Sequence, residues 1–93
     1  MRDDWFEWDD RKAARNFRLH RVTFESARQT FEDPRAIDRL DLDEPGEDRT
    51  LLTGLVNDVL LTVCFTERGH RIRIISARRA TNREQDDYNR QAS

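Results

Sequence analysis

The chain has 93 residues, so we expect one domain, spanning residues 1–93, with a small core. Charged residues make up 39% of the sequence and hydrophobic residues 35%, with a formal net charge of −2. The single cysteine excludes an intrachain disulfide framework, and no apolar run approaches the roughly twenty residues of a membrane helix, so we expect a cytoplasmic protein.

Two helices are predicted after a short opening strand. The strand covers Trp5–Trp8, and Asp9 is placed to cap a first helix that runs to about Leu19. Thr23 can cap a second helix, which Pro34 ends. We expect these helices to form a hairpin. The inward side of the first helix is predicted from its apolar spacing to contain Ala13, Phe17 and His20.

A run of four strands is predicted next. The first covers Ala36–Leu42 and is followed by a turn at Pro45-Gly46. Three consecutive strands start at Thr50 and are joined by tight turns at Asn57-Asp58 and Arg68-Gly69. Strands connected in this way form an antiparallel meander.

The chain should end in a short helix. The stretch from Thr81 to Glu84 has the form of a capping box, and Tyr88 is the one apolar anchor of the helix that follows, so we expect this helix to dock weakly. The predicted fold class is α+β, with an antiparallel sheet packed against an N-terminal helical hairpin and the order β-α-α-β-β-β-β-α.

The region between the last predicted turn and the last helix is rich in arginine and contains no acidic residue. Strict alternation predicts Arg71, Arg73 and Ile75 on one face of the strand, opposite Ile72, Ile74 and Ser76. The arginines could pair with the six acids between Asp38 and Asp48, or they could bind a polyanion such as a phosphodiester backbone. The six arginines are Arg68, Arg71, Arg73, Arg78, Arg79 and Arg83.

Several short strings occur in order along the chain: FEWD from Phe6, Lys12-Ala13 with Asn16 and His20, VTFESA, Phe31 with Asp33-Pro34, and TERG followed by RIRIISARRAT. Together they resemble the BrnT-type toxins of BrnT-BrnA toxin-antitoxin modules. The resemblance implies a bacterial ribonuclease toxin with a RelE-like fold, held inactive in a hetero-oligomer by a BrnA-like antitoxin that also binds operator DNA. Arg21 stands where the family usually has glycine, and Arg79 where it usually has lysine.

Cleavage of RNA through its 2′-hydroxyl needs a base, an acid and positive charge at the phosphate. The histidines and acids show no metal-ligand spacing, so we expect a reaction without metal or cofactor. Our hypothesis is that Arg73 and Arg78 stabilise the transition state. The residues predicted to bind RNA are Arg68, Arg71, Arg79, Arg83 and Tyr88.

The candidate proton carriers are Glu67 and His20. Glu67 could equally be a surface carboxylate paired with a neighbouring arginine, and a protonated His20 could simply stabilise the C-terminus of its helix. Tyr88 could be a packing residue alone. An alternative for the whole chain is a non-catalytic interaction module whose basic sheet face binds an acidic partner.

Overall fold

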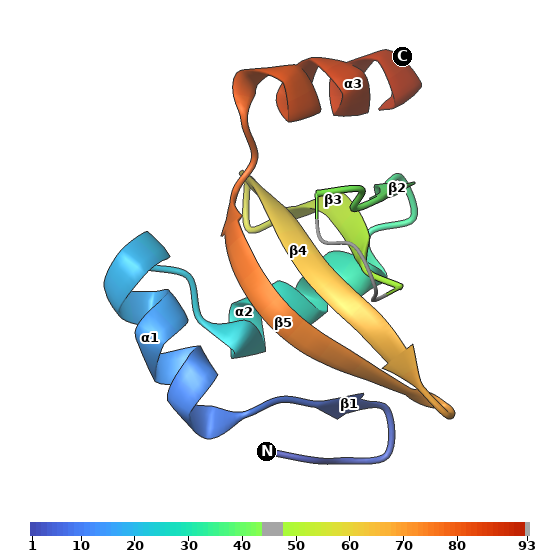
Figure 1. Ribbon diagram of the computed structural model, residues 1–93. Helices are drawn as coiled ribbons and strands as arrows, with labels where there is room; N and C mark the ends of the chain where they lie inside the picture. The colour runs from blue at the N-terminus through green and yellow to red at the C-terminus, as the bar shows by residue number, and fades with distance from the viewer. Residues whose placement is uncertain (44–47, 93) are drawn as a thin grey trace.

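The computed structural model describes residues 1–43 and 48–92 and has the predicted order of elements (Figure 1). Its five-stranded sheet has the strand order β1-β5-β4-β3-β2, in which β1 pairs with β5 in parallel and all other pairs are antiparallel. The predicted α+β class is confirmed. The elements are β1 (Phe6–Glu7), α1 (Asp10–His20), α2 (Phe24–Arg28), the 3-10 helix η1 (Gln29–Glu32), β2 (Ile37–Leu40), β3 (Thr50–Val56), β4 (Val59–Arg68), β5 (Arg71–Arg79) and α3 (Asn82–Ala92).

The first two helices pack on different parts of the sheet. In Figure 1, α1 lies beside β5, whereas α2 passes behind β4 and β5. A helical hairpin is therefore not a clear feature of the fold. The core lies between α2 and the strands β4 and β5, because the apolar side chains of these elements meet there. Its most deeply buried members are Phe24, Ala27, Val63, Ile74 and Ala77.

The inward side of α1 agrees with the prediction only at Ala13, which is partly buried against the core. Its buried residue is Asn16, which is 5% exposed, whereas Phe17 is 41% exposed and carries the Arg21 guanidinium over its ring. His20 is also exposed. The prediction was wrong for Phe17 and His20 because α1 covers the edge of a strand, where backbone groups need hydrogen bonds more than apolar contact.

Asn16 supplies those hydrogen bonds. Its Nδ2 donates to the carbonyl of Ala77 at 2.8 Å, and its Oδ1 accepts from the Ala77 N–H at 3.1 Å. The strand β1 pairs with β5 only at Ile72 and Arg73. The amide of Asn16 therefore continues the hydrogen bonding at the edge of β5 beyond the point where β1 ends.

Both predicted turns are present, the second displaced by one residue. Asn57 and Asp58 have φ of 48° and 68° and form the two-residue turn between β3 and β4. The β4–β5 turn consists of Gly69 and His70, because Arg68 still pairs with Arg71. The strand β2 is shorter than predicted, and the predicted Pro45-Gly46 turn lies outside the described residues.

The capping box of α3 is confirmed. The Glu84 carboxylate accepts from the Thr81 N–H at 2.8 Å, and the Glu84 N–H donates to the Thr81 hydroxyl at 3.2 Å. Tyr88 is 6% exposed, and its hydroxyl donates to Asp33 at 2.7 Å. No helix in the described part of the chain is long and apolar enough to cross a membrane.

Candidate functional site

A β-bulge in β5 determines which side chains share a face of the sheet. Ile74 pairs with Phe65 and Ser76 pairs with Cys64, so Ile75 has no partner on β4. An extra residue of this kind reverses the alternation of side chains that follow it. The expectation that Ser76 shares a face with Ile74 was therefore wrong.

The reversed alternation brings two of the predicted site residues to one face. Ile74 and Ala77 are both buried in the core, although they are three residues apart. Arg73 and Arg78 lie on the opposite face of the sheet. Thr62 of β4, which is the register partner of Arg78, lies on this face as well. We call this surface the arginine face and define it by Arg73, Ser76 and Arg78 of β5 together with Thr62, Cys64 and Thr66 of β4.

Arg73 is held by a carboxylate from the neighbouring strand. Its Nη1 donates to Oε2 of Glu7 at 2.7 Å, and the two residues are register partners across β1 and β5. The side chain of Arg73 is 28% exposed. The hydrogen bond from Arg73 lowers the pKa of Glu7, and the charges of Arg73, Arg2 and Arg68 lower it further.

The side chain of Arg78 makes more hydrogen bonds than that of Arg73. Its Nη1 and Nη2 donate to the two carboxylate oxygens of Glu84 at 2.7 and 3.2 Å. The same carboxylate accepts from Arg39 at 2.8 Å and from the Thr62 hydroxyl at 2.9 Å. Burial alone would raise the pKa of Glu84, but hydrogen bonds from Arg78, Thr81 and Arg39 outweigh it and lower the pKa to about 2.

Both arginines of the hypothesis therefore lie on one face, and each is already paired with a carboxylate. The paired carboxylates come from β1 and α3 and not from the acidic stretch between Asp38 and Asp48. Within that stretch, the charge of Asp41 contributes to raising the pKa of Arg78, after the larger effect of its hydrogen bond to Glu84.

The other arginines predicted to bind RNA are spread over the molecule. The Nε of Arg71 donates to the backbone carbonyl of Asp3 at 2.8 Å and so holds the N-terminal segment. Arg79 pairs with the core residue Leu61 and lies on the opposite face from Arg78. Arg83 is exposed at the start of α3. Of these three, Arg71 shares the face of Arg73, as alternation predicted, whereas Arg79 does not.

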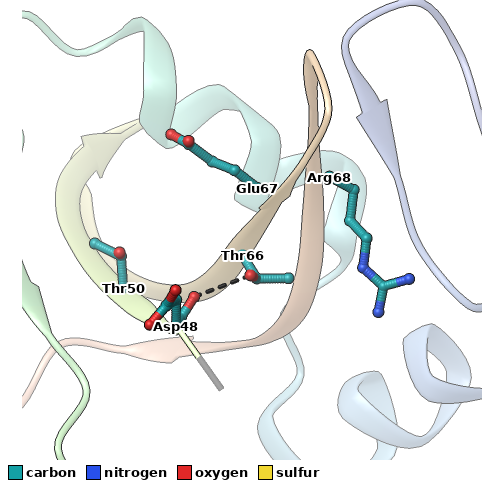
Figure 2. Close-up of a pocket in the computed structure, with 5 residues that line it drawn as sticks. All are labelled: Asp48, Thr50, Thr66, Glu67 and Arg68. Atoms are coloured by element: carbon teal, nitrogen blue, oxygen red, sulfur yellow. Dashed lines mark hydrogen bonds between the residues drawn. The ribbon is translucent and has the colours of Figure 1, made fainter. Parts of the chain in front are cut away.

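The two candidate proton carriers lie at different places. Glu67 pairs with Ile72, which packs against the core, so Glu67 is on the opposite face from Arg73. Figure 2 shows Glu67 and Arg68 projecting to opposite sides of the β4–β5 hairpin, beside the bond from Thr66 to the Asp48 carbonyl. His20, in contrast, lines a groove between α1 and β5 that Ser76 of the arginine face also lines.

Sequence reasoning missed the two carboxylates that hold Arg73 and Arg78. A weak signal existed for each: Glu7 alternates with the inward-facing Phe6 in the opening strand, and Glu84 belongs to the capping box. Within residues 1–43 and 48–92, no three His, Cys, Asp or Glu side chains gather in a way that could hold a metal ion.

Comparison with known proteins identifies the family of the chain. None of the curated proteins is significantly similar to it. The family model described as the ribonuclease toxin BrnT of type II toxin-antitoxin systems matches residues 8–84, which is most of the chain. The chain therefore belongs to the BrnT family of ribonuclease toxins of type II toxin-antitoxin systems.

Proposed function

We propose that the chain is an endoribonuclease that cleaves RNA on its arginine face without a metal ion. Family membership supports RNA as the substrate. The observation that carries the location is the bulge at Ile75, which brings Arg73 and Arg78 to the same face. Two guanidinium groups on one face suit a phosphate that gains negative charge during the reaction.

Arg73 is the group that stabilises the transition state in this proposal. A guanidinium carries five N–H donors, and within the described residues this one makes a single hydrogen bond, to Glu7. Glu7 fixes its direction and leaves donors for a phosphate oxygen. Arg78 makes more bonds within the protein, and we assign it a second contact to the phosphate or to its neighbour. Arg68, whose charge acts on Glu7, adds to the positive potential near Arg73.

The reaction is an internal displacement at phosphorus. The 2′-oxygen forms a bond to the phosphorus and the bond to the 5′-oxygen breaks, which leaves a 2′,3′-cyclic phosphate and a 5′-hydroxyl. One group takes the proton of the 2′-hydroxyl and another donates a proton to the leaving oxygen. We propose His20 for one of these transfers, because it lines the same groove as Ser76 of the arginine face. Glu67 is left out, since it is on the face opposite Arg73.

The partner in this proposal is a DNA-binding antitoxin of the BrnA type. Membership in a type II toxin-antitoxin family implies an antitoxin partner. We propose that the antitoxin binds the toxin in a hetero-oligomer and prevents cleavage. Adding purified antitoxin to an active toxin should abolish cleavage at a fixed stoichiometry, whereas undiminished cleavage by the isolated complex would contradict this arrangement.

One observation favours the alternative of a non-catalytic interaction module: Arg73 and Arg78 are both already paired with carboxylates. The deciding experiment incubates the purified protein with RNA in EDTA and analyses the ends of the products. New fragments with 2′,3′-cyclic phosphate and 5′-hydroxyl ends support the enzyme. Intact RNA across varied sequences, also with ribosomes present, supports the interaction module.

A further inference from the structure

A groove runs between α1 and β5 beside the arginine face. Asn16 of α1 is bonded to Ala77 of β5, so the residues one turn away from Asn16 lie along the same strand. Lys12 is one turn before it. Together with Arg15, it lines this groove, and Ile75 and Ser76 form the strand side.

The groove continues from the arginine face. Ser76 belongs to both, because the bulge turns it to the face of Arg73. Asp9, the N-cap of α1, lies close enough to both regions to interact with a cation of each. The Lys12 N–H lowers the pKa of Asp9 by a hydrogen bond, and the charges of Lys12 and Arg73 lower it further. Lys12 and Arg73 therefore both act on the same carboxylate.

The charged side chains that line the groove are all cationic. They are Lys12, Arg15 and Arg49, with His20 beside them, and among the described residues no carboxylate lines it. Lys12 and Arg15 are exposed. The positive charges of Lys12 and Arg15 repel one another in this groove, and an anion between them relieves that repulsion. The ammonium and guanidinium groups also suit phosphate oxygens as hydrogen-bond acceptors.

We propose that this groove is a second phosphate subsite, in which Lys12 and Arg15 bind a backbone phosphate next to the one cleaved. The ligand class is single-stranded RNA, and the strand passes from Arg73 along the edge of β5 onto α1. This inference rests on the proposed function, because it takes the arginine face as the cleavage site.

Binding tests the subsite without requiring activity. The probe is a fluorescent 12-nucleotide RNA with 2′-O-methyl groups throughout, which cannot be cleaved through a 2′-hydroxyl. We expect the double variant Lys12→Ala/Arg15→Ala to bind it about tenfold more weakly. The slope of log Kd against log salt concentration should fall by about 0.7 for each phosphate that the variant no longer neutralises.

The matched control is Arg11→Ala/Arg18→Ala, which removes two cations from α1 that do not line the groove. This control should bind the probe nearly as the wild type does, and circular dichroism checks that both variants are folded. Equal affinity and equal salt slope in the two double variants would overturn the subsite. A loss of affinity for double-stranded DNA with no loss for RNA would overturn the ligand class.

A cleavage experiment separates this inference from the proposed function. A second oligonucleotide has one cleavable ribonucleotide among deoxynucleotides, and a dinucleotide substrate has no neighbouring phosphate. Removing Lys12 and Arg15 should raise the KM for the oligonucleotide about tenfold and affect the dinucleotide less. If the wild type cleaves neither substrate and also leaves varied RNAs intact with ribosomes present, the proposed function fails, and the binding experiment alone then decides whether the groove holds RNA.

Discussion

The carboxylate of Glu84 joins α3 to the sheet, and replacing it with an amide should destabilise the fold. The side chain is buried and accepts hydrogen bonds from Arg78, Arg39 and Thr62. A pKa lowered from 4.5 to about 2 corresponds to roughly 3 kcal/mol in favour of the charged form, at about 1.4 kcal/mol per pH unit. Glu84→Gln keeps the size but leaves two cations without a counter-charge, so we expect a loss of about 3 kcal/mol.

Urea unfolding at pH 7, followed by circular dichroism, measures this loss. The matched control is Asp86→Asn, an exposed carboxylate on the same helix, which should change the free energy of unfolding by no more than about 0.5 kcal/mol. A Glu84→Gln protein as stable as this control would show that the charge of Glu84 does not hold α3 to the sheet.

The pH dependence follows from the sign of the shift. A carboxyl group with a lowered pKa in the folded protein contributes stability above its unfolded value, and that contribution disappears as the pH falls through the folded value. The difference in stability between wild type and Glu84→Gln should therefore be constant from pH 5 to pH 8 and shrink between about pH 4.5 and pH 2.

Three further substitutions test the packing that positions the site, each by the same unfolding measurement. Asn16→Ala should cost about 2 to 3 kcal/mol, because it leaves the buried N–H and carbonyl of Ala77 without partners, and a loss below 0.5 kcal/mol would contradict the edge role. Gly54→Ala should cost about 1 to 3 kcal/mol, since the added Cβ would lie 2.8 Å from Thr30 Cγ2; no loss would mean that η1 can move away freely. Arg21→Gly should stabilise the protein by about 0.5 to 1 kcal/mol, because φ at Arg21 is 58°; a destabilised variant would show that the contact of Arg21 with Phe17 matters more.

The order of elements could be predicted from sequence because its signals are local. The caps Asp9 and Thr23 and the capping box at Thr81 all act within one turn of helix. The Asn57-Asp58 turn likewise depends on two residues that tolerate positive φ. The extended conformation at Asp33 follows from the proline after it.

The site could be predicted only in part, because its geometry depends on contacts between distant segments. Strict alternation along β5 holds from Arg71 to Ile74, but the bulge at Ile75 arises in the pairing with β4 and leaves no mark in the sequence. The pairing of Arg73 with Glu7 joins residues 66 positions apart. The buried Asn16 was missed because helical periodicity identifies apolar faces and not the edge of a strand that needs hydrogen bonds.

The proposed function depends above all on Arg73 as the group that stabilises the transition state of RNA cleavage, and the cleavage rate of Arg73→Ala measures this contribution. The control is Arg11→Ala, since Arg2 lies too close to Glu7 to serve. Arg73→Lys keeps the charge and shows how much the planar donor group contributes. With all proteins shown to be folded, we predict that Arg73→Ala cleaves RNA at least about a hundredfold more slowly than the wild type and Arg11→Ala. Cleavage by folded Arg73→Ala at the wild-type rate would show that Arg73 does not stabilise the transition state.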